Sequence, residues 1–248
     1  MTYADLPILL PALVAGLLVL ATHIPFGMKI IERGVIFADL AVAQIAGLGV
    51  ITAGLLGLQQ THPLLLQTVA GGSALAGAAL LVWIERRLPH VKEAAIGLTF
   101  VLAASASVLL MSRDVHAGEH LQELLVGQIL WIGENQLLAL GGLSALLLTL
   151  WRWPALRQHP FGFYSLFALA VTASVQLAGV YLVFASLIVP ALATLRCARH
   201  RIAFAFLVGL GGYALGLLGS VWFDLPAGAA IVWAMSACGA AVALWQRA

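Results

Sequence analysis

The sequence carries little charge for its length. Asp, Glu, Lys and Arg make up 9% of its 248 residues, whereas a typical soluble domain carries about 25%. This shortage excludes an ordinary soluble enzyme, a disordered protein, a nucleic-acid binder and a coiled coil, because each of those classes depends on many exposed charges.

Cysteine and lysine are also scarce. The two cysteines are too few for a disulfide framework. The two lysines, Lys29 and Lys92, follow Met28 and Val91, whereas the lysine of an ATP-binding P-loop follows glycine. We therefore expect that the chain is not an enzyme and holds no permanent cofactor. Any ATP-driven process would require a separate ATPase subunit.

What the sequence has instead is long apolar runs. Hydrophobic residues make up 62% of the chain, and one transmembrane helix needs about 20 of them in a row. The sequence therefore predicts an all-α polytopic membrane protein with about eight or nine transmembrane helices, some of them broken. Nine spans would use about 180 residues, so we expect a single transmembrane domain over residues 1–248. The predicted spans are 6–24, 35–57, 64–84, 94–112, 135–151, 162–178, 179–195, 202–222 and 227–246.

Glycine and proline mark where these spans pack or break. The two runs after Phe161 are either two short spans that meet near Gly179 or one long broken span. Pro190 should kink the second run, because proline removes a backbone hydrogen bond. Small residues four apart, as in Gly212 and Gly216, favour close helix packing.

Basic residues collect on one side of the predicted membrane. All but one of the lysines and arginines fall in alternate loops or at the C-terminus, and only Arg113 falls in the other set of loops. The positive-inside rule therefore places the N-terminus outside and the C-terminus in the cytoplasm. The residues on the inner side are Lys29, Arg33, Arg86, Arg87, Lys92, Arg152, Arg157, Arg196, Arg199, Arg201 and Arg247.

The outer side carries acidic residues and histidines. Its negative charge would raise the local concentration of cations. Its densest segment, residues 114–123, contains His116, Glu119 and His120. On a helix, four-residue spacing puts both imidazoles on one face beside a carboxylate, a set that suits Zn²⁺ and other first-row metals. A metal-collecting site and a solvated polar loop both fit this pattern. A protease site of the H-x-x-E-H type is disfavoured, because Gly118 weakens the helix.

Asp39 lies inside a predicted span. A carboxylate there is costly unless it is paired or hydrated, so it indicates a functional site by default. The alternative is that Asp39, near the cytoplasmic end of the span, caps the helix or reaches the membrane surface. Gln44 follows five residues later, about 140° round a regular helix. The two side chains would therefore meet only if the helix were broken or wound open.

Five features, taken in order along nearly the whole chain, carry a resemblance to a known family. The chain resembles the ABC-3 type membrane permease of bacterial zinc and manganese ABC importers. The matching features are Glu32-Arg33-Gly34-Val35-Ile36-Phe37-Ala38-Asp39, Glu93 with Gly97, Val126-Gly127-Gln128-Ile129-Leu130, the run from Gly179-Val180 to Val189-Pro190-Ala191, and Phe223-Asp224-Leu225-Pro226-Ala227-Gly228-Ala229.

Three features depart from that family's pattern. The family usually has a histidine, a metal ligand, four residues after its Asp, whereas this chain has Ala43. An Asp of its outer motif is Gln128 here. The inner segment before the sixth span, which contacts the ATPase in the family, is reduced to residues 151–163. These changes bear on the identity of the metal and on the coupling to an ATPase.

The resemblance implies the permease subunit of an ATP-driven importer of divalent metal ions in the bacterial inner membrane, with zinc favoured and manganese next. Zn²⁺ or Mn²⁺ would be the transported substrate. Its path would use Asp39, Gln44, His116, Glu119 and His120. The implied partners are a cytoplasmic ATP-binding-cassette ATPase, an extracytoplasmic metal-binding protein, a second permease copy that completes a homodimer, and the lipid membrane. Nucleic acid is not among them.

Two other interpretations stay open. A permease of the same broad architecture for a metal chelate, such as a siderophore or a corrin, usually has a longer chain. A stand-alone proton-coupled cation carrier needs several acidic residues inside the membrane, and the predicted spans contain essentially one, Asp39.

Overall fold

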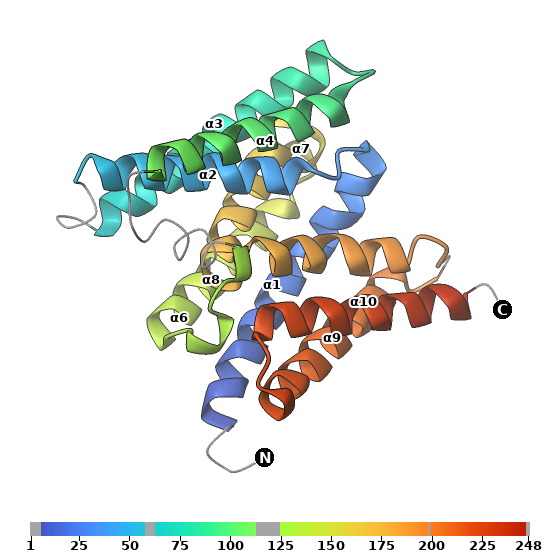
Figure 1. Cartoon of the computed structure of the whole chain (residues 1–248). Coiled ribbons are helices and arrows are strands. Elements are labelled where there is room, and N and C mark those ends of the chain that lie inside the picture. Colours follow the sequence, from blue (N-terminus) through green and yellow to red (C-terminus); the bar gives the residue numbers. More distant parts are fainter. Residues whose placement is uncertain (1–5, 58–62, 113–124, 198, 247–248) are drawn as a thin grey trace. The chain divides into compact units, whose positions relative to one another are not determined.

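The computed structural model describes residues 6–57, 63–112, 125–197 and 199–246 (Figure 1). Every regular element in these ranges is a helix, which confirms the predicted all-α class. The chain divides into two compact units. Unit 1 comprises Met1–Arg33, Leu125–Leu148 and Ser174–Ala248, and unit 2 comprises Gly34–Leu124 and Thr149–Ala173.

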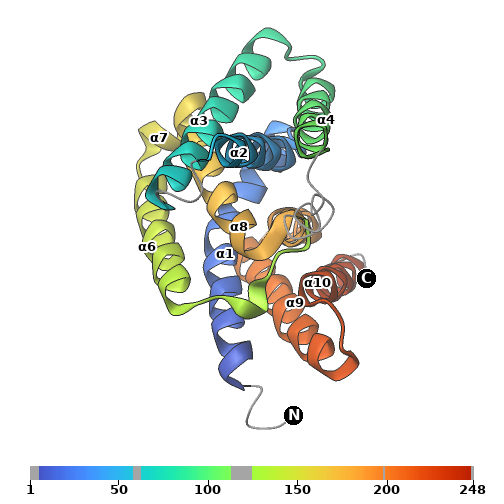
Figure 2. The same ribbon diagram turned by 60° about the vertical axis from the view of Figure 1, so that its left-hand side comes forward.

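Unit 1 is built on three long helices and half of a fourth. They are α1 (Leu6–Arg33), the second part of α8 (Pro160–Ala193), α9 (Arg201–Phe223) and α10 (Ala227–Trp245). The short turn η1 (Ile129–Trp131) and most of α6 (Glu134–Trp151) complete the unit. Helix α9 packs between α10 and α1 through direct contacts with both (Figures 1 and 2).

Glycines let α9 and α10 approach each other closely. A Cβ on Gly212 would collide with Met235, and a Cβ on Gly216 would collide with Ile231. Both glycines are buried, as the four-residue spacing predicts. Between helices in lipid, association depends on van der Waals packing rather than on the hydrophobic effect. The absence of side chains at these two positions therefore stabilises the pair by allowing more atomic contact.

Helix α8 breaks at Gly179, which confirms the predicted break. Its φ of 78° and ψ of 161° are angles that only glycine adopts readily. Gly127 also has a positive φ, and a Cβ on either glycine would collide with the backbone of the other segment. The Gln128 N–H donates to the Leu177 carbonyl at 3.2 Å, so a neighbouring segment satisfies a carbonyl beside the break. After Gly179 the helix continues through Pro190 to Ala193.

The main part of unit 2 is formed by three packed helices, α2 (Ala38–Leu55), α3 (Pro63–Arg87) and α4 (Lys92–Met111). Helix α2 lies between α3 and α4 and contacts both (Figure 2). The unit also contains the end of α6, the short helix α7 (Pro154–Gln158) and the first part of α8. Gly49 allows α2 to approach α3, because a Cβ there would collide with Ser73.

Seven helices in the described part of the chain are long and apolar enough to cross a membrane: α1, α2, α3, α4, α8, α9 and α10. The nine predicted spans differ from these seven for two reasons. The two runs around Gly179 form one broken helix, α8. Helix α6 corresponds to the predicted span 135–151 but is not among the seven; it begins with Glu134, Asn135 and Gln136, which lower its mean hydropathy.

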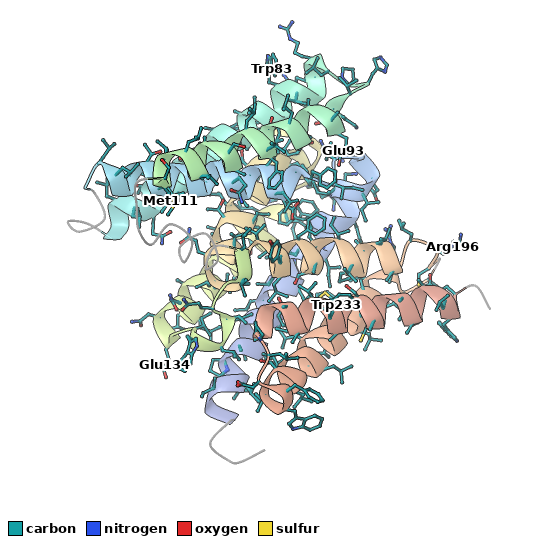
Figure 3. The ribbon with its side chains drawn as sticks, viewed as in Figure 1. Trp83, Glu93, Met111, Glu134, Arg196 and Trp233 are labelled. Carbon is teal, nitrogen blue, oxygen red and sulfur yellow. The ribbon has the colours of Figure 1, made fainter. Side chains whose placement is uncertain are left out.

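Large apolar side chains cover the outside of these helices, as expected of surfaces that face lipid. Trp83 on α3 is 54% exposed and Trp233 on α10 is 79% exposed (Figure 3). Exposed apolar side chains of this size are unfavourable in water but favourable in a bilayer. The chain is therefore a multi-pass membrane protein.

The first helix is longer than the predicted span 6–24. Helix α1 continues past Pro25 as far as Arg33. Ile30 is fully buried in this extension, and the Lys29 ammonium lies 3.0 Å from the Glu32 carboxylate one turn away. Packing and this ion pair explain why the helix does not end at the proline.

Candidate functional site

Asp39 lies in the first turn of α2. Its side chain is 2% exposed, and the backbone N–H groups of Asp39 and Leu40 lie against its carboxylate. A negative charge is favourable at this position, because the first turn of a helix exposes N–H groups and carries partial positive charge. One oxygen, Oδ1, is nevertheless buried without a hydrogen-bond partner.

Glu93, at the start of α4, supplies a second carboxylate. The Phe37 N–H, immediately before α2, donates to Glu93 Oε1 at 3.1 Å. The other oxygen of Glu93, Oε2, is buried and has no hydrogen-bond partner. Figure 3 shows Glu93 at the beginning of α4, with Met111 at the opposite end of that helix. We call Asp39, Glu93 and the Phe37 N–H the carboxylate corner.

The carboxylate corner joins the beginnings of two helices. Because the Phe37–Glu93 hydrogen bond ties the start of α2 to the start of α4, both helices begin on the same side of unit 2. Arg33 lies six residues before Asp39, and Lys92 immediately precedes Glu93, so this is the side that the positive-inside rule assigns to the cytoplasm. The corner thus lies at the inner ends of α2 and α4 in that topology.

Chemically, the corner offers oxygen ligands. Glu93 acts electrostatically on Asp39, and two like charges in a buried place destabilise each other unless a cation or a proton neutralises them. Each acid has one oxygen free to bind a cation. Carboxylate oxygens suit Mn²⁺, and Zn²⁺ also accepts them. Within the residues that the structure describes, no group of three or more His, Cys, Asp or Glu side chains gathers as a metal site. The corner is thus a partial ligand set.

The structure does not bring Gln44 to this corner. Helix α2 is regular from Ala38 to Leu55, so Gln44 projects about 140° away from Asp39. Ala43 is one helical turn after Asp39 and is 6% exposed. The position at which the resembling family has a histidine is therefore buried on the Asp39 side of α2, and here it carries a methyl group.

The three outer candidates, His116, Glu119 and His120, lie in residues 113–124, outside the described residues. Their role stays a prediction. Gln128, which stands where the resembling family has an Asp, lies next to Gly127, and its N–H donates to the Leu177 carbonyl. Its backbone thus has a structural role within unit 1.

The segment 151–163 of unit 2, which the positive-inside rule assigns to the cytoplasmic side, is compact. It contains α7, whose five residues are all at least partly exposed. The Arg157 guanidinium lies 6.0 Å from the centre of the Trp151 ring, and Trp151 in turn contacts Phe163 with ring centres 6.0 Å apart. These contacts hold a short, basic and exposed helix at the end of the membrane-spanning helices.

The sequence alone did not assign a role to two polar residues, the half-buried Glu93 and the buried His23. Glu93 was identified only as part of a family resemblance, and its position opposite Asp39 follows from the pairing of α2 with α4, which no sequence pattern specifies. The predicted span 6–24 ends one residue after His23, whereas in the structure His23 lies within α1 and is fully buried. The available signal was the long apolar run before His23 and the five uncharged residues that separate it from Lys29.

The chain matches a known protein family over nearly its full length. A family model described as the ABC 3 transport family matches residues 5–160 and 155–245. A comparison with curated proteins found no significant match.

Two solved structures have a similar fold. PsaBC from Streptococcus pneumoniae, in complex with a Fab, aligns with a TM-score of 0.72 and 22% identity over 99% of this chain and 91% of that one. A protein described as a metal-chelate type ABC transporter, in an inward-facing conformation, aligns with a TM-score of 0.65 and 17% identity. That alignment covers 95% of this chain and 85% of the other. At these identities the likeness shows the fold alone.

Proposed function

Because the chain belongs to the ABC 3 transport family, we propose that it is the membrane permease of an ATP-driven importer of divalent metal ions. The observation that carries the proposal is the carboxylate corner, where Asp39 and Glu93 each keep a buried oxygen without a partner. A membrane protein that keeps two carboxylates with one unpartnered oxygen each accepts a cost in stability. Passage of a cation explains why that cost is tolerated.

The proposed path begins at the outer histidines and reaches the carboxylate corner. His116, Glu119 and His120 would receive the ion at the outer mouth, and Asp39 with Glu93 would bind it at the inner ends of α2 and α4. Gln44 would join Asp39 only if α2 unwinds during transport, because it lies on another face. A ligand set this small suits brief binding rather than storage.

The preferred metal in this proposal is zinc, with manganese second. Imidazole nitrogens favour zinc, whereas carboxylate oxygens suit both Zn²⁺ and Mn²⁺. The preference for zinc therefore depends on the outer histidines, because the carboxylate corner does not discriminate between Zn²⁺ and Mn²⁺. The transported ion is the substrate, and the proposal requires no permanent cofactor.

The proposed assembly has two copies of this permease, two cytoplasmic ATPase subunits and an extracytoplasmic metal-binding protein in the bacterial inner membrane. The N-terminus would lie outside and the C-terminus in the cytoplasm. Helix α7 is the proposed contact for the ATPase, because it is short and exposed and is held by Arg157 on Trp151. An ATPase subunit is required because this chain has no P-loop lysine.

A pull-down from native membranes tests the proposal. The tagged permease would be extracted in mild detergent, and its partners would be identified by mass spectrometry. We expect a P-loop ATPase in an amount close to that of the permease. Recovery of the permease alone, together with ATP-independent cation flux in liposomes, would instead support a stand-alone proton-coupled carrier.

A permease for a metal chelate is the second candidate, and it is favoured by the likeness to the metal-chelate type transporter. Uptake of free metal ions separates the two. An ion importer accumulates radioactive zinc or manganese without any chelator, whereas a chelate permease accumulates the metal only when a siderophore or a corrin carries it.

A further inference from the structure

His23 is a buried histidine for which the proposed path so far has no use. It lies in the middle part of α1 and is fully buried, and Thr22 beside it is 2% exposed. Both residues belong to unit 1. A histidine in the apolar interior of a membrane protein is unfavourable unless its two ring nitrogens have partners.

One ring nitrogen has partners that fix its protonation. His23 Nδ1 lies 2.9 Å from the Val19 carbonyl oxygen and 2.9 Å from Thr22 Oγ1. A carbonyl oxygen can only accept, so Nδ1 carries the hydrogen and donates it. In the neutral ring, Nε2 is then a bare acceptor. Histidines that bind metals through one nitrogen are commonly oriented in this way, with the other N–H donating to a backbone carbonyl.

The second ring nitrogen has no partner. His23 Nε2 is buried and makes no hydrogen bond with any described residue. Removal of an acceptor from water without replacement costs stability. Val19 and Thr22 therefore supply hydrogen-bond partners for Nδ1, whereas Nε2 keeps an unpaired acceptor.

The helix face that carries His23 is the packed face of α1. Gly16, Leu20, His23 and Gly27 recur every three or four residues and so share one side of the helix. Gly16 contacts the Tyr213 ring of α9, Leu20 lies against Gly209 of α9, and Gly27 lies against the Leu187 carbonyl of α8. His23 thus lies between positions that contact α9 and a position that contacts α8.

The same packed region contains a second polar pair. Ser186 on α8 and Tyr213 on α9 form a buried hydrogen bond of 3.1 Å between their hydroxyl groups. Ser186 precedes Leu187, which contacts Gly27, and the Tyr213 ring contacts Gly16. The faces of α1, α8 and α9 that meet within unit 1 therefore carry an imidazole and two hydroxyl groups rather than apolar side chains alone.

We propose that His23 is a nitrogen ligand for the transported metal ion, through Nε2, during one step of transport. Because Nε2 is closed off in the present packing, the ion would reach it when α1 shifts against α8 and α9. The inference rests on the proposed function and extends it, because it gives this chain an imidazole that the second span lacks at Ala43. A nitrogen ligand would favour zinc over manganese.

The test compares three variants of the full permease in cells that carry the rest of its transporter. His23→Leu removes both nitrogens and keeps an apolar side chain of similar volume. His23→Gln keeps an oxygen acceptor near the position of Nε2. His90→Gln is the matched control, because His90 is exposed on the turn between α3 and α4. Uptake of radioactive zinc and of radioactive manganese is measured for each, with the amount of permease in the membrane and its melting temperature.

If His23 is a ligand, His23→Leu folds at least as well as the original protein, because an unpartnered acceptor has been removed. Its zinc uptake nevertheless falls about tenfold or more. His23→Gln shifts the preference toward manganese, because the amide oxygen is a harder ligand than imidazole. His90→Gln changes neither uptake.

Three results would overturn the inference. Unchanged zinc uptake in His23→Leu would make His23 a packing residue. If His23→Leu does not accumulate, an unchanged ratio of zinc to manganese uptake in His23→Gln leads to the same conclusion. If the original protein imports neither ion, the proposed function falls together with this inference, whereas in the first two cases the inference falls alone.

Discussion

The carboxylate corner of unit 2 and His23 of unit 1 both contain buried polar atoms without a hydrogen-bond partner, but they are held in different ways. The corner lies where two helices begin, and the exposed N–H groups of those helix starts stabilise its negative charges. His23 lies inside a continuous helix, where the preceding turn supplies the partners of Nδ1, the Val19 carbonyl and the Thr22 hydroxyl. Both sites thus contain a polar atom without a partner. In unit 2 this atom belongs to a carboxylate at a helix start, and in unit 1 it belongs to an imidazole that the preceding helical turn orients.

This difference separates the two sites by chemistry. Helix beginnings supply hydrogen-bond donors, so they collect acids and provide oxygen ligands. The carbonyl of a preceding helical turn supplies an acceptor, so it orients an imidazole and provides a nitrogen ligand. We therefore expect the corner to serve any divalent cation and His23 to serve zinc preferentially.

The largest effect is expected at Asp39. Asp39→Asn keeps the size and the hydrogen bonding of the side chain but removes its charge. Uptake of zinc and of manganese should fall together by about 100-fold, the upper end of what loss of a metal-site residue costs, while the melting temperature stays the same or rises. The measurement is uptake of both ions at equal permease levels. Unchanged uptake would remove Asp39 from the path.

Glu93 should have a smaller effect on the same two ions. Glu93→Gln retains an oxygen that accepts from the Phe37 N–H, so the starts of α2 and α4 stay joined. It removes one of two negative charges, and we expect uptake of both ions to fall about tenfold. Glu85→Gln, a change at a partly buried glutamate near the end of α3, is the control. A loss confined to zinc would contradict the chemical difference between the two sites.

Thr22 tests how His23 is oriented. Thr22→Val preserves the shape of the side chain and removes the hydroxyl beside Nδ1, whereas the Val19 carbonyl still accepts from the ring. Zinc uptake should fall about threefold, because one neutral hydrogen bond contributes about 1 kcal/mol or less. Manganese uptake should not change. An equal fall for both ions would indicate altered packing of α1 rather than loss of a nitrogen ligand.

The smallest effect is expected at Gln44. In a regular α2 its side chain does not share the face of Asp39, so Gln44→Leu should change uptake of either ion by less than about twofold. The assay is the one used for Asp39. A loss comparable to that of Asp39→Asn would mean that α2 unwinds during transport and brings the two residues together.

Much of the fold follows from the sequence. The long apolar runs predicted the membrane-spanning helices, and Gly179 marked the break in α8 because its position requires angles that other residues rarely adopt. The boundaries were less predictable. Helix α1 passes Pro25 because Ile30 is buried and Lys29 pairs with Glu32, and such packing cannot be read from composition. This longer helix is why His23 is internal.

The candidate site was predictable only in part. A carboxylate within an apolar run is conspicuous in the sequence, so Asp39 was identified as a candidate from the sequence alone. Glu93 was not, because its role depends on which helix start lies beside that of α2, and helix pairing leaves no local pattern. The expected partner, Gln44, is separated from Asp39 by the regular turn of α2. The histidines of the outer segment lie outside the described residues, and their role stays a prediction.

ATP-driven metal transport through Asp39 is tested by metal uptake into liposomes that contain the permease and the ATPase recovered with it. The metal-binding protein and zinc or manganese would be supplied on the outer side, and ATP on the ATPase side. If Asp39 lies on the path of an ATP-driven metal importer, accumulation requires ATP hydrolysis and is lost in Asp39→Asn. Accumulation that continues without ATP, or that is unchanged in Asp39→Asn, would contradict it.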